Sequence, residues 1–118
     1  MYFSANLGCV GCHERGYLAP LAANIYDLAT TVRLAKPALA GMTTEQYLAE
    51  SILRPSAYIV PGFTDLMPYF YRDRLSHQQI EDIIAYLQAR SKERRSFEAA
   101  KMMLQTTLQE WMTTLCVC

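Results

Sequence analysis

The 118-residue sequence predicts an all-α fold, and three observations lead to that prediction. Apolar side chains recur at helical spacing from Ile80 to Leu87, and a second such stripe starts at Phe97. Residue types that cap helices, threonine and serine, stand directly before two of the expected helices. No pair of alternating apolar runs flanks a tight turn, so the sequence contains no signal for a β-hairpin.

The composition excludes one class of function. The chain has 11 basic and 11 acidic residues, whereas nucleic-acid binders usually carry a strong basic excess. Apolar residues make up 52% of the chain, which suits a small domain that buries a cofactor or docks on a partner. No uncharged apolar run reaches the roughly 18 residues needed to span a bilayer. We therefore expect no nucleic-acid partner and no transmembrane span of its own.

The first 42 residues are expected to contain two helices. Tyr2, Phe3 and Leu7 lie at roughly helical spacing, which predicts a helix over residues 2–13. Glycine and proline then punctuate residues 14–42 and favour a loop. Within that loop a short helix is expected, because apolar residues recur at helical spacing at Ile25, Leu28, Val32 and Ala35. We expect this stripe to pack in the core or at the edge of a cofactor.

A third helix is expected to run to about Leu53, with Thr43 or Thr44 as its N-cap and Pro55 as its stop. The following stretch, residues 55–68, is irregular but unusually apolar. Its large apolar residues are Tyr58, Ile59, Val60 and Phe63. Residues 57–60 could form a buried strand, but the sequence offers no partner strand. We therefore expect a loop that wraps over a cofactor.

The clearest helix starts at Ser76, because a capping box with Gln79 precedes the apolar stripe from Ile80 to Leu87. We expect this helix to end near Arg90, where a basic stretch starts. A separate amphipathic helix is expected from Ser96. Its apolar stripe comprises Phe97, Ala100, Leu104, Leu108, Trp111 and Leu115. The chain is thus expected to divide into a domain of residues 1–92 and a helical tail of residues 93–118 that docks on a partner or a membrane.

The most specific motif is Cys9-Val10-Gly11-Cys12-His13, which reads Cys-x-x-Cys-His, the attachment signature of c-type haem. On a short helix the two cysteines lie one turn apart, so each thiol can add to one vinyl group of the same porphyrin. His13 is then carried under the ring, where an imidazole nitrogen can bind iron. The motif predicts one haem c, covalently bound through Cys9 and Cys12.

Two other sites that use a Cys-x-x-Cys pair are less well supported. A structural zinc site needs a second pair of ligands, and His77, Cys116 and Cys118 do not form a convincing one. A redox dithiol follows a strand in a βαβ pattern, and the sequence lacks that pattern. Haem attachment is therefore favoured. We expect Cys116 and Cys118 to be unused thiols or thiols buried against a partner.

A low-spin electron carrier needs a second strong ligand on the other side of the iron. Met67 is the best candidate because it ends the apolar loop and precedes the last helix. A thioether at this place stabilises ferrous iron and raises the reduction potential. The alternative is a methionine that fills a gap in the core. His77 is a rival ligand, although its place in the first turn of the last helix already accounts for it.

Together these features resemble class I cytochrome c over about residues 2–90. The resemblance rests on the Cys-x-x-Cys-His motif, on Pro20, on Met67-Pro68 and on Tyr86 in the final helix. It implies that His13 and Met67 are the two axial ligands of the iron. It also implies that the carbonyl of Pro20 is hydrogen-bonded to the histidine ring, and that Tyr86 packs across the first helix near Phe3.

The loop over residues 51–63 resembles that of monohaem cytochrome domains attached to membrane respiratory complexes. Examples are cytochrome c domains fused to oxidase subunit II and the monohaem subunit of alternative complex III. The resemblance implies other subunits of such a complex as partners, together with a redox-partner cytochrome or copper protein. Within this loop, Arg54 and Tyr58 are the side chains that we expect near the haem propionates. The tail has no counterpart in the family.

The expected function is one-electron transfer, without enzymatic activity of its own, as a fixed subunit of a membrane-bound electron-transport complex. Haem c is attached outside the cytoplasm, so we expect the protein on the periplasmic side, held at the membrane by its partners. No signal peptide is visible, and we expect a targeting segment outside this sequence. The alternatives are a freely diffusing periplasmic carrier and a haem enzyme or gas sensor with an open axial site.

Overall fold

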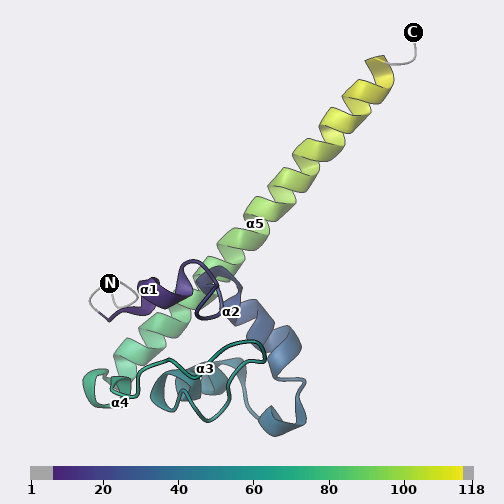
Figure 1. Cartoon of the computed structure of the whole chain (residues 1–118). Helices are drawn as coiled ribbons and strands as arrows, with labels where there is room; N and C mark the ends of the chain where they lie inside the picture. Colours follow the sequence, from purple (N-terminus) through teal and green to yellow (C-terminus); the bar gives the residue numbers. More distant parts are fainter. Residues whose placement is uncertain (1–6, 116–118) are drawn as a thin grey trace.

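The computed structural model describes residues 7–115, with side chains up to Thr113, and this part of the chain is built from helices and loops (Figure 1). The elements are α1 Cys9–His13, α2 Ala22–Leu28, the π-helical turn η1 Ala29–Arg33, the 3-10 turn η2 Pro37–Leu39, α3 Thr44–Leu53, α4 Tyr71–Arg74 and α5 His77–Leu115. Within residues 7–115 there is no strand. The predicted all-α class is therefore confirmed.

The core forms where the first half of α5 packs on α2 and α3. Burial of these apolar side chains removes them from water, which is the main force that holds a domain of this size together. From α5 it contains the predicted stripe of Ile80, Ile83, Ile84 and Leu87. From α2, η1 and α3 it contains Ala22, Ile25, Ala29, Tyr47, Leu48 and Ile52.

Two helices start where the sequence predicts, each at a capping box. The Gln46 amide donates to the Thr43 hydroxyl at 3.1 Å, and the Thr43 amide donates to the Gln46 side chain at 3.0 Å. At the start of α5, the Gln79 amide donates to the Ser76 hydroxyl at 3.2 Å, and the Ser76 amide donates to the Gln79 side chain at 2.8 Å. Each box satisfies amide groups that have no partner inside the helix. Thr43 is thus the cap of α3.

The predicted helix over residues 2–13 is wrong in its described part. Residues 7 and 8 form a turn, and α1 begins only at Cys9. Gly8 has a φ of 78°, in the left-handed region that glycine enters without steric cost, and this conformation starts α1 in a new direction. Residues 1–6, with Phe3 and its expected contact to Tyr86, lie outside the described residues.

The short helix expected near Ile25 exists as α2 and η1, but its buried face differs from the predicted one. Leu28 and Val32 are 38% and 48% exposed, whereas Arg33 is 7% exposed. The Leu34 amide donates to the carbonyl of Ala29 at 3.1 Å, five residues back, so this turn is wider than an α-helical turn. The wider turn rotates Val32 outward and keeps Arg33 on the same side as buried Ala29.

The last helix is longer than predicted. We expected it to end near Arg90, but α5 continues without a break to Leu115, and no separate helix starts at Ser96. The basic stretch is rich in arginine, lysine and glutamate, which favour helices, and α5 contains neither glycine nor proline. The division after residue 92 stays a prediction. The second half of α5 extends beyond all other elements in Figure 1, and the molecule measures 68 × 34 × 25 Å.

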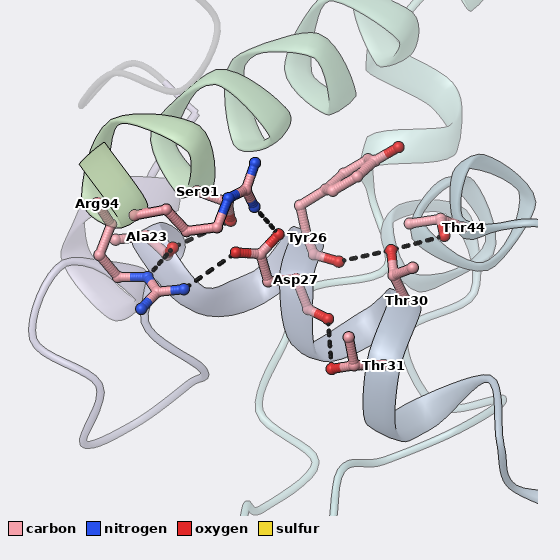
Figure 2. Close-up of polar contacts among 9 residues, drawn as sticks. Ala23, Tyr26, Asp27, Thr30, Thr31, Thr44, Ser91 and Arg94 are labelled. Carbon is pink, nitrogen blue, oxygen red and sulfur yellow. Dashed lines mark hydrogen bonds and ion pairs between the residues drawn. The ribbon is translucent and has the colours of Figure 1, made fainter. Parts of the chain in front are cut away.

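A group of polar contacts ties α5 to α2 where the helix leaves the core (Figure 2). The buried Ser91 hydroxyl donates to the carbonyl of Ala23 at 3.0 Å, and Arg94 Nε donates to the same carbonyl at 3.3 Å. Arg94 also pairs with Asp27 at 3.0 Å, and Arg95 pairs with the other carboxylate oxygen. These contacts fix the direction in which the second half of α5 projects.

Candidate functional site

A cavity of about 310 Å³ lies between α1, η1, α3 and the loop that follows α3. Its volume is in the range of small-molecule sites, and its walls are mainly apolar. Most of the wall comes from residues 18–20 and from residues 58–71. The loop expected to wrap over a cofactor therefore does line a cavity. The alternative of a strand over residues 57–60 is wrong, because residues 57 and 58 form a bend and residues 59 and 60 form irregular loop.

Cys9, Cys12 and His13 all line this cavity from the single turn of α1. Residues three and four positions apart lie on the same face of a helix, which explains why the three side chains share one side. Cys9 is half-buried and Cys12 is exposed, and neither is in a disulfide within the described part of the chain. Burial raises the pKa of the Cys9 thiol. Both residues thus present thiol groups to the same cavity.

His13 is oriented by the chain segment that follows α1. Its Nδ1 lies 2.7 Å from the carbonyl oxygen of Pro20, which can only accept, so Nδ1 donates the hydrogen bond. The proton therefore sits on Nδ1 and the lone pair on Nε2, the form of imidazole that binds metals. Burial lowers the pKa of His13 more than the contact with Pro20 raises it, which favours the neutral ring. This contact is the one that the resemblance implied.

Met67 and Tyr58 reach the same cavity from the loop. Met67 is half-buried and packs against the core cluster. Tyr58 is also half-buried, and its ring lies edge-to-face with that of Tyr47, with centroids 6.1 Å apart. The structure therefore brings together all six sequence-predicted site residues around one cavity. The exposed Arg54 is not among the residues that line it.

Three further residues of the wall were missed by the sequence analysis, namely Arg33, Tyr47 and Tyr71. The hydroxyl of buried Tyr71 donates to the carbonyl of Leu7 and so ties α4 to the segment before α1. Burial raises the pKa of Tyr71. Tyr47 lies on the predicted third helix, four residues before Ser51, which also lines the cavity. No pattern signalled Arg33, because a charged residue is expected to face water.

His77, the alternative ligand of the iron, lies away from this cavity. His77 is the first residue of α5, its side chain is almost fully exposed, and its Nε2 lies 3.8 Å from a carboxylate oxygen of Glu81. It does not line the cavity. Within residues 7–115 no three histidine, cysteine, aspartate or glutamate side chains gather as a metal-binding group. Cys116 and Cys118 lie outside the described residues.

Comparison with known families identifies a match over most of the chain. The sequence model of the Cytochrome c family matches residues 3–91, which is most of the chain. The chain belongs to the cytochrome c family. No curated protein and no solved structure matches this cytochrome. None of its helices within residues 7–115 is long and apolar enough to cross a membrane.

Membership of the family implies a covalently bound haem c, and the residues of the cavity fit that group. Two thiols and an imidazole with its lone pair on Nε2 stand on one face of α1. A thioether and a mainly apolar wall complete the donor set and the surroundings that a porphyrin needs. The family match also supports a role in haem-based electron transfer.

Proposed function

We propose that this cytochrome carries one electron on a single haem c, with His13 and Met67 as the axial ligands of the iron. The observation that supports this proposal best is the hydrogen bond from His13 Nδ1 to Pro20, in a cavity that Met67 also lines. The haem supplies the redox chemistry by cycling between its ferric and ferrous forms. His13 and Met67 would hold the iron in both forms, so that little rearrangement would accompany electron transfer.

The residues of the chain have distinct tasks in this function. Pro20 holds the ring of His13 in one orientation and raises its basicity as a ligand. The thioether of Met67 favours the ferrous form and raises the reduction potential. The apolar wall excludes water, which strengthens every electrostatic effect in the cavity. Cys12 is exposed, so the side of the site next to the cysteines is where an electron enters and leaves.

The test replaces each of two half-buried methionines in turn. Met67→Leu keeps the volume but removes the thioether, whereas Met42→Leu makes the same change in a methionine that packs on the core outside the cavity. In the haem-loaded protein, we expect Met67→Leu alone to lose the weak methionine-sulfur charge-transfer band and to bind carbon monoxide. A Met67→Leu protein that keeps the band and excludes carbon monoxide contradicts the proposed ligand.

We further propose that the cytochrome is a fixed subunit of a membrane electron-transport complex of the respiratory chain, on the periplasmic side. Its partners are other subunits of that complex and a redox-partner cytochrome or copper protein. The supporting observation is the exposed second half of α5, where every described side chain from Arg95 onward is exposed. Large apolar residues in this segment are 56–72% exposed. A free monomer rarely exposes so much apolar surface in one place.

The spacing along this segment fits a helix as the partner's docking element. Phe97, Leu104 and Trp111 are seven residues apart, and Leu108 lies on the same stripe. A repeat of seven residues keeps one seam facing a neighbouring helix over its whole length. The segment therefore suits an apolar helix of another subunit better than a flat surface.

The docking proposal is tested in detergent extracts of membranes from cells that produce the cytochrome. We expect the wild type to migrate with a large complex that has quinol- or cytochrome-oxidising activity. The double variant Leu104→Gln/Trp111→Gln should migrate alone, while the matched change Met102→Gln, on the opposite face of the helix, should not. If the double variant stays with the complex, the stripe is not the docking element. A wild type that migrates alone points to the freely diffusing carrier.

A further inference from the structure

The exposed apolar stripe in the second half of α5 matches itself when its direction is reversed. One lysine, Lys101, belongs to this stripe, because it follows Phe97 by four residues on the same face of the helix. Residues 104 and 108 stand at equal distances from position 106, and the same holds for residues 101 and 111 and for residues 97 and 115. A second copy of the helix that runs in the opposite direction therefore meets the stripe in register.

The reversed register pairs side chains of matching chemistry. At the centre, Leu104 of each copy meets Leu108 of the other, which gives two apolar contacts. On either side, Lys101 of one copy meets Trp111 of the other, and a lysine ammonium is attracted to the face of an indole ring. At the two ends, Phe97 faces position 115, the last residue of α5. The lysine within the stripe thus gains a partner instead of interrupting the apolar contact.

A parallel pair of the same helices is disfavoured by charge. Equal positions of the stripe would then meet, so Lys101 would stand beside Lys101 of the second copy. At the edge of the stripe, Glu93 of one copy would lie near Glu98 of the other. Like charges across a seam select against the arrangement that brings them together. No ion pair found within residues 7–115 involves Lys101, so the folded chain does not neutralise this charge itself.

The shape of the molecule leaves room for an antiparallel pair. The second half of α5 extends beyond all other elements in Figure 1, and every described side chain from Arg95 onward is exposed. Residues 97–115 span about 27 Å at the helical rise of about 1.5 Å per residue. An antiparallel neighbour of that length ends beside residue 97. The two domains that hold the cavities would therefore lie at opposite ends of the paired helices.

We propose that the second half of α5 binds the same segment of a second copy of this chain, as an antiparallel pair of helices. The inference rests on the proposed docking function and names its partner, because the subunit that supplies the neighbouring helix is another copy of the cytochrome. The proposed complex then holds the cytochrome as a pair, and each copy helps to hold the other.

The pair is expected to form reversibly. A contact of this length is small for a specific interface, so we expect a dissociation constant on the order of micromolar. Dilute protein is then monomeric, and its unfolding depends on its own domain alone. At higher concentration the stripe is covered, which removes a large apolar patch from water.

The test measures self-association of the purified, haem-loaded full chain by sedimentation velocity over a series of concentrations. We expect wild type to change from monomer to dimer. Lys101→Glu turns an attraction to the face of Trp111 into a repulsion at two places in each dimer, so its dissociation constant should rise by about tenfold or more. The control Lys92→Glu makes the same charge change on the opposite face of α5 and should stay within about twofold of wild type. Equal dissociation constants in the two variants overturn the inference, as does a wild type that stays monomeric up to about 100 μM.

A mixture of wild type and Lys101→Glu tests the direction of the helices. In a parallel pair, Lys101 would stand beside the new carboxylate, so the mixture would associate more tightly than wild type alone. In the antiparallel pair, residue 101 faces Trp111 in every combination, so the mixture should associate with an intermediate strength. Tighter association of the mixture contradicts the antiparallel arrangement.

The emission of Trp111, the only tryptophan of the chain, reports on the contact without any substitution. It should move to shorter wavelength as the dimer forms, because the indole leaves water. A dimer with unchanged emission uses another surface and overturns the inference.

Failure of this inference can be told apart from failure of the proposed function. A wild type that is monomeric when pure but migrates with a large complex in membrane extracts overturns the pairing and leaves the proposed docking intact. A wild type that dimerises when pure but migrates in the extracts as the pair alone supports the pairing and contradicts the proposed complex.

Discussion

The two halves of α5 carry the same kind of apolar stripe but meet different surroundings. In the first half, Ile80, Ile83, Ile84 and Leu87 are buried against α2 and α3. In the second half, Phe97, Leu104, Leu108 and Trp111 are exposed. The change comes at Ser91, the last fully buried residue of the helix. Helical periodicity therefore identifies an apolar stripe but not what covers it. The first half of α5 is covered by this domain, whereas the second half is exposed, and we propose that it docks on another subunit.

This difference gives α5 two roles. Its first half closes the domain that holds the cavity, and its second half offers the exposed apolar surface that we propose for docking. The polar contacts of Ser91 and Arg94 with α2 lie between the two halves. They make the direction of the exposed half depend on the packing of the buried half (Figure 2).

The largest contrast is expected from the same substitution made in each half. Leu87 is 4% exposed and Leu104 is 62% exposed. Leu87→Ala should lower the free energy of unfolding by about 2–5 kcal/mol, because it leaves a cavity in the core. Leu104→Ala should change it by less than about 0.5 kcal/mol. Urea unfolding of the purified haem-loaded protein measures both values, and equal losses show that the exposed half packs on its own domain.

A smaller loss of stability is expected from a substitution where the two halves of α5 join. Ser91→Ala removes a buried hydroxyl that donates to the carbonyl of Ala23. Arg94 still donates to that carbonyl, so the expected loss is about 1 kcal/mol rather than the cost of an unsatisfied group. Urea unfolding of Ser91→Ala measures this loss. The matched change Ser96→Ala, at an exposed position of the same helix, should be neutral; if both variants lose the same stability, the junction has no special role.

The smallest loss of stability is expected from a substitution of Asp27, and this loss depends on pH. Hydrogen bonds from Arg95 and Arg94 lower the pKa of the Asp27 carboxyl in the folded protein. Its contribution is therefore present above the unfolded pKa of about 4 and is lost as the pH falls through the lower folded value. The ion pairs are partly exposed, so Asp27→Asn should cost under about 1 kcal/mol at pH 7. Unfolding at pH 7 and pH 2.5 should show a smaller difference in the free energy of unfolding between variant and wild type at pH 2.5 than at pH 7.

Features that depend on neighbouring residues were predictable from the sequence. The capping boxes at Thr43 and Ser76 need only residues three positions apart, and the Cys-x-x-Cys-His motif needs a single helical turn. The contact of His13 with Pro20 followed from the family resemblance and spans seven residues. These features explain why the start of two helices and the cluster of Cys9, Cys12 and His13 could be anticipated.

Features that depend on the backbone path or on distant surroundings were not predictable. Val32 faces outward at a π turn, which no residue pattern around it announces. The start of α1 at Cys9 depends on the left-handed conformation of Gly8. The change of composition at Arg90 indicates a boundary, but the residues on both sides of it favour a helix, and α5 continues through it.

The most direct test of the central claim is a pair of visible spectra, oxidised and reduced, of the wild-type protein made with haem-ligation machinery. Axial ligation by His13 and Met67 predicts sharp reduced bands of haem c, the weak methionine-sulfur charge-transfer band in the oxidised form, and no change with carbon monoxide. Haem c that lacks this band and binds carbon monoxide contradicts the electron carrier and favours a haem enzyme or sensor. Protein without haem contradicts the site itself.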